Sequence, residues 1–372
     1  MKAKTRNLIR FICFVLILML LYSSVSCLFI PKDDEWKNFR GLYAESRDSL
    51  DIIYLGGSVC IVSWMPYESW SESGLTSYAF GKSNFPSFAY EPVIKEALSR
   101  QSPQLLIIDA RPFVYTYTEL HDDVLSAVPL ISCLKTFSPN RPPIARICYD
   151  IYSNEVAEGD RETSFETFAS IFFDIVRYHI NWSSLDSSFF PNVENSLPCN
   201  YSKGFLEVAR HKALTLRDNS GVISSKAVNP RAESDLTALL DYLDRIGMDA
   251  LFVVAPYDER AGEKAQYNYL AGIIEDRGQR FVDFNDFTDE IGIDSSTDFY
   301  NANHLSVFGA EKYTAYLSGY IKENYSIQSA HSDDVIDSWE RGYPLWSERL
   351  TALKGAVAAL IAEEDKGDSS NE

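Results

Sequence analysis

The chain has 372 residues, of which 46% are hydrophobic and 13% aromatic, so it can bury a substantial core and is not intrinsically disordered. Its net charge is −19, and because residues 1–30 contain four basic residues and no acidic one, the rest of the chain carries −23. Nucleic acid is excluded as an expected partner, because phosphate neutralisation needs clustered cations.

An uncharged apolar segment, Phe11 to Ile30, lies near the N-terminus. At about 1.5 Å per residue a helix of this length matches the roughly 30 Å hydrocarbon core of a bilayer. Basic residues precede it, so the positive-inside rule predicts a cytoplasmic N-terminus. We therefore expect residues 1–31 to form a basic end and a transmembrane anchor, giving a single-pass cell-membrane protein with an extracytoplasmic body.

Two processed forms remain open as alternatives to an uncleaved anchor. Ser24-Val25-Ser26 offers small residues at the spacing of a signal-peptide cleavage site. Cys27 follows directly and is an alternative site of lipid attachment, although residue 24 is not the leucine usual in lipoprotein signals.

After this segment the pattern alternates between short apolar runs and helical periodicity. Strands are predicted at 51–55, 105–109, 250–255 and 280–284, and helices at 90–101, 233–246, 267–277 and 307–323. Such alternation predicts an α/β domain over residues 36–325, with a mostly parallel sheet between two helical layers, as in flavodoxin-like folds.

Residues 114–229 interrupt this pattern with a proline-rich stretch at 138–143 and an aromatic helical stretch around 165–179. We interpret them as an insertion that caps or borders the site. Residues 326–372 predict an amphipathic helix followed by an acidic disordered tail. The cysteines show no CxxC or Cys/His spacing for zinc, but a single Cys133–Cys148 disulfide is compatible with an oxidising compartment.

The first predicted strand ends in Gly56-Gly57-Ser58. A serine after two glycines suits nucleophilic catalysis, because small residues admit substrate and the following backbone N–H groups can stabilise an oxyanion. The Gly-Gly-Ser motif alone is weak evidence for a catalytic serine, since turns are rich in glycine and serine. The carboxyl ends of parallel strands meet at one edge, however, so the residues that follow the later strands are expected beside Ser58: Asp109, Arg111, Tyr257 and Asp258.

A histidine in a polar segment, His304, lies just before the last predicted helix. It is the one histidine of five in such a setting; we interpret the others as structural or surface residues: His121, His179, His211 and His331.

Together, Leu55-Gly56-Gly57-Ser58 and the segment from Asp298 to Lys312 resemble the SGNH (GDSL-like) hydrolase superfamily, in which a serine follows the first strand and Asp-x-x-His precedes the last helix. The resemblance spans about residues 36–322. Within the superfamily, the chain looks most like the membrane-anchored, surface-exported branch. This branch includes relatives of the teichoic-acid D-alanyl transfer protein and of polysaccharide O-acetyltransferase domains.

The resemblance implies that Ser58 is the nucleophile and His304 its base. It also implies an oxyanion hole formed by the backbone N–H groups of Ser58 and Gly81. Where the family has Gly-x-Asn-Asp after a middle strand, this chain has Asp109-Ala110-Arg111-Pro112. The missing side-chain donor is then Arg111 or Asn84, unless Asp109 and Arg111 only shape the loop.

The third member of the expected triad also departs from the family pattern. Asn301 occupies the position three residues before His304, where the family has aspartate. An amide can fix the imidazole tautomer but cannot offset its developing charge. Asp298, one turn earlier, is the alternative carboxylate.

The resemblance implies an extracytoplasmic serine esterase or O-acyltransferase that moves acyl groups, such as acetyl, on a cell-envelope polysaccharide. The implied partners are that polysaccharide, the membrane and a membrane acyltransferase. No nucleotide-binding glycine motif or His-x-x-x-His occurs, so we expect no cofactor and no metal.

Two other functions are compatible with the sequence. One is a non-catalytic glycan-binding or assembly protein of the cell surface, with Trp182, Phe189 and Phe190 as sugar-stacking residues. The other is an unrelated flavodoxin-like domain in which Ser58 is only a turn residue. In that case its Oγ should lie more than about 6 Å from the His304 ring, beyond hydrogen-bond reach.

Overall fold

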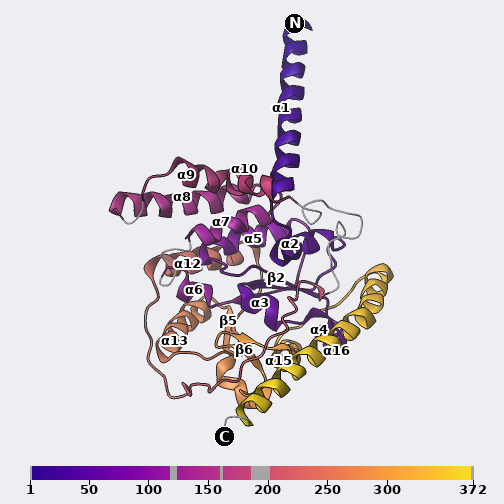
Figure 1. The fold of residues 1–372 in the computed structure, drawn as a ribbon, viewed down its shortest axis with the longest axis vertical. Helices are drawn as coiled ribbons and strands as arrows, with labels where there is room; N and C mark the ends of the chain where they lie inside the picture. Colours follow the sequence, from indigo (N-terminus) through magenta and orange to yellow (C-terminus); the bar gives the residue numbers. More distant parts are fainter. Residues whose placement is uncertain (1, 118–123, 160–161, 186–201, 370–372) are drawn as a thin grey trace. The chain divides into compact units, whose positions relative to one another are not determined.

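The structure is a computed structural model that describes residues 2–117, 124–159, 162–185 and 202–369 (Figure 1). The chain forms two compact units, one made of residues 1–36 and 124–197 and the other of residues 37–123 and 198–372. Helix α2 (Asp34–Ala44) spans the boundary between them. The predicted insertion at 114–229 is thus shared: its central part belongs to the same unit as the N-terminal helix.

A five-stranded parallel sheet is the centre of the second unit, which makes the fold mixed α/β as predicted. Its strands are β1 (Ile52–Gly56), β2 (Ser77–Gly81), β3 (Leu105–Asp109), β4 (Ala250–Val254) and β5 (Arg280–Asp283). The first four strands are buried at every position, which explains the apolar runs of β1, β3 and β4. Strand β2 was not predicted, because Ser77-Tyr78-Ala79-Phe80-Gly81 is neither a continuous apolar run nor a clean alternation.

The strand order is β2-β1-β3-β4-β5. In doubly wound sheets of this order the direction of winding reverses between β1 and β3, and ligands bind outside the carboxyl ends of these strands. The carboxyl ends of β1 and β2 approach closely: a Cβ on Gly81 would lie 2.4 Å from the Gly56 carbonyl oxygen. Glycine at position 81 is therefore needed to keep β1 and β2 paired at this edge.

The helices of the second unit fall into two groups that pack among themselves. In one group, α15 (Val307–Asn324) contacts α3 (Ser58–Ser63), α4 (Pro66–Ser73) and α16 (Asp333–Ser369). In the other group, α12 (Pro230–Ile246) contacts α5 (Tyr90–Leu98) and α6 (Pro112–Tyr115), and α6 contacts α13 (Ala261–Asp276). The short α14 (Thr288–Ile291) packs on α15, and two short 3₁₀ helices, η1 (Ser87–Ala89) and η5 (Phe284–Phe287), complete the connections.

The C-terminal helix α16 packs on the sheet unit through buried aromatic side chains. The Tyr67 ring lies 4.9 Å from the Trp339 ring and 6.3 Å from the Trp346 ring, measured between centroids. The predicted amphipathic helix is therefore present. The expected disordered tail is wrong as far as Ser369, because the helix continues to that residue; residues 370–372 lie outside the described part.

The free edge of β2 is covered by side-chain and backbone groups. The Ala79 N–H donates to the Lys203 carbonyl, and the Asn38 side-chain amide donates to the Ala79 and Gly204 carbonyls. Lys203 itself is held by a buried ion pair with Glu45 at 2.9 Å. Covering an edge strand in this way protects it against pairing with another chain.

The first unit contains α1 (Lys2–Phe29), α7 (Val124–Cys133), α8 (Arg141–Glu158), α9 (Phe165–Phe172), α10 (Asp174–Tyr178) and the 3₁₀ helix η2 (His179–Ser183). α1 is long and apolar enough to cross a membrane. Cys133 and Cys148 are buried thiols that no disulfide joins, so the bridge considered from the sequence is not formed here.

Close backbone packing at the start of α15 yields a prediction. A Cβ at Gly309 would lie 2.3 Å from the Asp298 carbonyl oxygen, whereas a Cβ at Gly319 in the same helix would meet nothing within 4 Å. We expect Gly309→Ala to lower the free energy of unfolding by about 1–3 kcal/mol through overpacking. The matched control Gly319→Ala should raise it by about 0.5–1 kcal/mol through helix propensity. Denaturant unfolding of the detergent-purified chain measures both; equal effects would contradict the close approach.

Candidate active site

Ser58 is positioned by the tight connection between β1 and α3, where it is the first residue of the helix. The Gly57 N–H donates to Asp109 Oδ2 at 3.3 Å, and a Cβ on Gly57 would lie 3.0 Å from the Tyr115 hydroxyl. The connection therefore has little room for a larger residue at position 57. The first backbone N–H groups of a helix have no acceptor within the helix. The Ser58 N–H at the start of α3 can therefore stabilise a developing negative charge.

His304 comes from a small antiparallel hairpin formed by β6 (Phe299–Asn301) and β7 (His304–Leu305). The two-residue turn pairs Asn301 directly with His304. The Asp258 N–H, which follows β4, donates to the Ala302 carbonyl of this turn at 2.9 Å. The hairpin is thereby tied to the carboxyl edge of the parallel sheet, on which Ser58 also lies.

The structure brings the two residues into direct hydrogen-bond contact: Ser58 Oγ lies 2.6 Å from His304 Nε2. The residues are separated by 246 positions in the chain. This distance does not fit the alternative in which Ser58 is only a turn residue, for which a separation above about 6 Å was expected. A hydroxyl in contact with an imidazole is the arrangement required for base-activated nucleophilic attack.

The orientation of His304 is set by Asn301, whose Oδ1 lies 2.9 Å from Nδ1. The Asn303 backbone N–H donates to the same Oδ1 at 2.8 Å. A backbone N–H needs an acceptor, so the amide oxygen and not the NH₂ group faces the imidazole. Nδ1 must then carry the ring proton, which leaves Nε2 unprotonated and able to accept the Ser58 proton.

The environment of His304 keeps its imidazole neutral. Burial, together with the positive charge of Arg111, lowers the pKa of His304 to about 3. The Tyr300 ring stacks on the imidazole at 5.1 Å with an interplanar angle of 6°. Tyr300 is the extra residue at an irregularity between the pairs Phe299–Leu305 and Asn301–His304, and such bulges often redirect a side chain toward a site.

Arg111 connects the sheet edge to the histidine hairpin. Its guanidinium donates to the Asn303 carbonyl at 2.9 Å and lies 4.2 Å from the centroid of the Tyr257 ring. Its backbone N–H donates to Asp109 Oδ1 at 3.1 Å. Asp109 thus shapes the loop through backbone hydrogen bonds from Gly57 and Arg111, and burial raises the pKa of its carboxyl group.

Two predictions for the site are wrong. Asp298 is not the orienting carboxylate: Oδ2 accepts from Lys312 Nζ at 2.6 Å and the Asp294 N–H at 2.8 Å, and Oδ1 accepts from Thr297 Oγ1 at 2.9 Å. It is fully buried and organises the segment before the hairpin. Gly81 does not offer its N–H to an oxyanion, because this group donates to Asn38 Oδ1 at 3.3 Å.

Asn84, the other predicted side-chain donor, is an exposed turn residue with a φ of 54°. Among the described residues, none is joined to the Asn84 side chain by a hydrogen bond. Of the two candidates, Arg111 is therefore the one that the structure places beside His304.

Several residues of the site were not predicted from the sequence: Asn38, Tyr300 and the backbone N–H of Asn303. Asn38 lies outside every motif in the chain. Its side chain forms hydrogen bonds with backbone groups, and such bonds leave no signal in the sequence. Tyr300 directly precedes Asn301, and Asn303 follows it by two positions, so recognition of 299–305 as a hairpin would have pointed to both.

No protein-family model, curated protein or solved structure matches the chain. Within the described residues, no group of three or more His, Cys, Asp or Glu side chains is arranged to hold a metal ion.

The proximity of Arg111 to His304 predicts a specific pKa response. A nearby positive charge disfavours the imidazolium form, so its removal in Arg111→Met should raise the pKa of His304 above its value of about 3. The control Arg245→Met removes an exposed arginine that pairs with Glu91 and should leave the His304 pKa unchanged. NMR titration of the chain with labelled histidine measures both. An unchanged His304 pKa in Arg111→Met would show that the guanidinium does not act on the imidazole.

Proposed function

We propose that the protein is an extracytoplasmic serine esterase or O-acyltransferase that acts on acyl groups of a cell-envelope polysaccharide. The observation that carries this proposal is the hydrogen-bonded series Ser58 Oγ, His304 Nε2, His304 Nδ1 and Asn301 Oδ1. It has the order nucleophile, base and orienting group that acyl transfer requires.

In the proposed reaction, Ser58 Oγ attacks the carbonyl carbon of an ester while its proton moves to His304 Nε2. The carbonyl oxygen becomes an oxyanion in the tetrahedral intermediate. When the intermediate collapses, the bond to the alcohol oxygen breaks and the proton on Nε2 passes to that oxygen. An acyl-serine ester remains, and water or a sugar hydroxyl then takes the acyl group by the same steps in reverse.

The donors that we assign to the oxyanion are the Ser58 backbone N–H and the Arg111 guanidinium. Gly81 is left out, because its N–H is bonded to Asn38. A guanidinium beside the site has opposite effects on the two charges of the transition state. The positive charge of Arg111 disfavours the imidazolium form of His304 and stabilises the oxyanion. Where the second effect is the larger, the low pKa of His304 is compatible with catalysis.

The location of the site is part of the same proposal. α1 is long and apolar enough to cross a membrane, and the basic residues at its start favour an extracytoplasmic body by the positive-inside rule. The parallel strand order and the two groups of packed helices support a three-layer SGNH-like α/β/α arrangement. An anchored enzyme of this kind would meet an emerging polysaccharide and a membrane acyltransferase that supplies acyl groups.

A non-catalytic glycan-binding or assembly protein is the second candidate. Two observations favour it: the orienting group is an amide, and the Gly81 N–H is occupied by Asn38. Of the proposed sugar-stacking residues, Trp182 has an exposed fraction of 71%, whereas Phe189 and Phe190 lie outside the described residues. Cells that carry Ser58→Ala distinguish the candidates, because only the binding protein keeps its function in that variant.

A fluorophosphonate probe tests the nucleophile directly. We expect the purified chain to become labelled and Ser58→Ala to lose the label, with any esterase activity falling by at least about 1,000-fold. The matched control is Ser63→Ala in the same helix α3, because the buried Ser63 hydroxyl has no hydrogen-bond partner among the described residues and can be removed at little cost. Labelling that persists in Ser58→Ala, or that is lost in Ser63→Ala, would contradict the assignment.

The orienting amide predicts a gain of function. Asn301→Asp places a carboxylate next to Nδ1, which favours the imidazolium and should raise the His304 pKa. We expect faster probe labelling at neutral pH and an acid limb of the pH–rate profile shifted upward from about 3. Asn301→Ala should slow labelling, since neither the tautomer nor the ring orientation is then fixed. Equal rates in all three proteins would show that Asn301 does not orient the base.

A further inference from the structure

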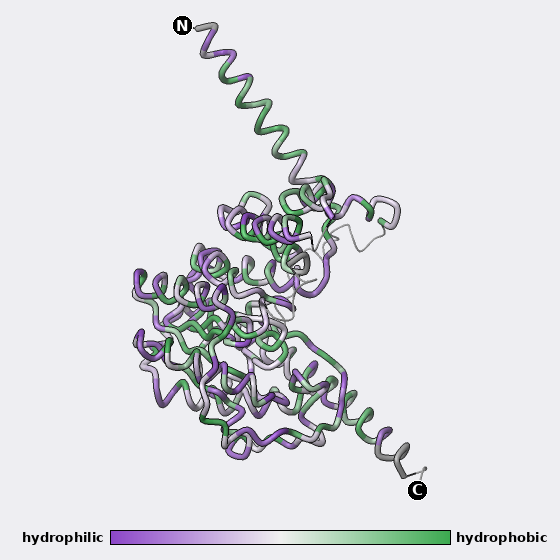
Figure 2. Tube along the Cα trace, turned by 90° about the vertical axis from the view of Figure 1, so that its left-hand side faces the viewer, coloured by the Kyte–Doolittle hydropathy of each residue, from purple (hydrophilic) through white to green (hydrophobic). Residues whose placement is uncertain are grey.

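The N-terminal helix α1 has an uncovered part and a covered part. From Leu8 to Leu21 its side chains are almost all exposed. They are apolar apart from Arg10, and this stretch of the tube is mostly green in Figure 2. Its last turns contact α10 and η2 of the same unit, Ser26 is buried, and the Asn181 side chain donates to the Phe29 carbonyl at 2.9 Å.

The length of the uncovered part is too short to span a bilayer. Arg10 sets the inner end of the apolar segment, and residues 11–21 cover only roughly 16 Å at about 1.5 Å per residue. The hydrocarbon core is about 30 Å thick, so residues 22–30 must supply the remainder. Most of these residues are partly or fully buried, and α1 contacts α10 and η2. If α1 spans the membrane, α10 and η2 therefore reach the outer leaflet.

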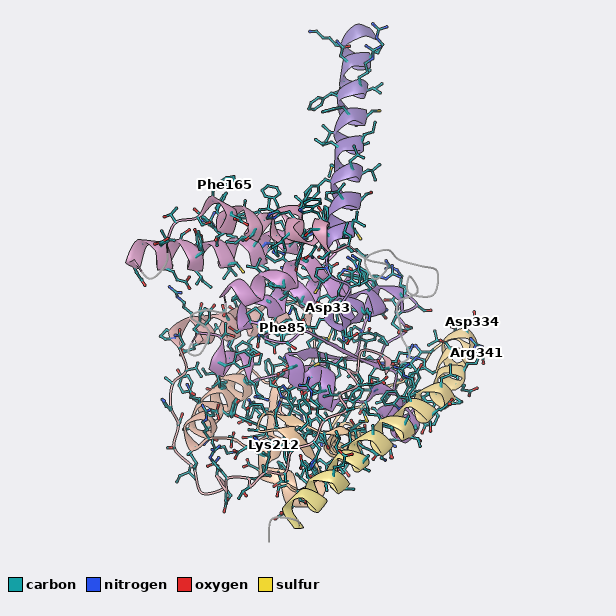
Figure 3. The ribbon with its side chains drawn as sticks, viewed as in Figure 1. Asp33, Phe85, Phe165, Lys212, Asp334 and Arg341 are labelled. Atoms are coloured by element: carbon teal, nitrogen blue, oxygen red, sulfur yellow. The ribbon has the colours of Figure 1, made fainter. Side chains whose placement is uncertain are left out.

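Exposed large apolar side chains are concentrated in this part of the first unit. Ile180 and Trp182 flank Asn181 in η2, with exposed fractions of 70% and 71%, and Phe165 at the start of α9 is 82% exposed. In Figure 3, Phe165 lies at the upper side of α9, and α1 extends upward from the same unit. We call the following six residues the aromatic apron: Phe165, Phe168, Phe172, Phe173, Ile180 and Trp182.

One cluster of charges next to the aromatic apron is paired inside the unit, whereas Glu166, beside Phe165, is exposed. Asp174 is fully buried and accepts hydrogen bonds from Arg141 at 2.5 Å and 2.6 Å and from Arg177 at 3.3 Å. Charged groups near a membrane are commonly paired within the protein in this way. Tryptophan and other amphipathic aromatic residues favour the boundary between headgroups and acyl chains.

We infer that the aromatic apron docks on the outer-leaflet interface of the bilayer that α1 crosses. The ligand is a lipid surface, recognised through burial of apolar rings at the headgroup boundary. This inference rests on the membrane anchoring in the proposed function and is independent of the chemistry at Ser58. A second copy of the chain or a glycan on the same residues is the competing outcome of the test.

Quenching by brominated lipid measures contact between a tryptophan and acyl chains. The full chain is reconstituted in phosphatidylcholine and phosphatidylglycerol vesicles with and without bromine on the acyl chains. We expect Trp182→Phe to remove much of the quenching. The control Trp346→Phe alters a buried tryptophan of the second unit and should leave the quenching unchanged.

A complementary pair of variants adds a tryptophan. Ile180→Trp should increase the quenching, whereas Ile223→Trp, at a 93% exposed position in the second unit, should not. Quenching that is unaffected by Trp182→Phe and Ile180→Trp would overturn the inference, as would crosslinking of Trp182-containing peptides between two copies of the chain or to added glycan.

The outcomes separate this inference from the proposed function. Mass spectrometry of the membrane-extracted chain shows whether α1 is retained, and its loss would overturn both the anchoring and the docking. If α1 is retained and Trp182 is not quenched, the docking alone fails. Probe labelling of Ser58 in the same vesicles reports on the chemistry independently of either result.

Discussion

The hydrogen bond between Ser58 and His304 depends on the hairpin that carries the histidine. The two-residue turn pairs Asn301 with His304, and the Asn303 N–H holds the Asn301 oxygen toward the ring. Without that N–H the amide could rotate and present its NH₂ group, which would favour the wrong tautomer. A backbone donor in the turn thus provides the orientation that a carboxylate provides in a Ser-His-Asp triad.

The parallel sheet supplies the rest of the arrangement. Its strand order places the carboxyl ends of β1 and β3 at the point where the winding reverses. Ser58 lies in the segment that follows β1, and Arg111 lies in the segment that follows β3. Asp109 joins the two connections by accepting the N–H groups of Gly57 and Arg111. The guanidinium then reaches the hairpin through the Asn303 carbonyl, so one arginine both supports the turn and lowers the pKa of His304.

Much of this could be predicted from the sequence. Four of the five strands and the main helices of the sheet unit follow from apolar runs and periodicity. Ser58 follows from its place at a strand end, and His304 from its polar segment before the last predicted helix. Asp298 was misjudged because spacing alone does not show that Lys312 and two neighbouring groups already use its carboxylate. Gly81 was misjudged because the hydrogen bond of its N–H goes to Asn38, 43 positions away.

We propose that Ser58 forms an acyl ester with His304 as its base. It is tested most directly by incubating the full chain with an activated acetyl ester, quenching in acid and mapping the acylated peptide by mass spectrometry. We expect one acetyl group on the peptide that contains Ser58, and slower acylation in His304→Ala. Acetylation elsewhere, or none on Ser58 in a folded protein, would contradict it.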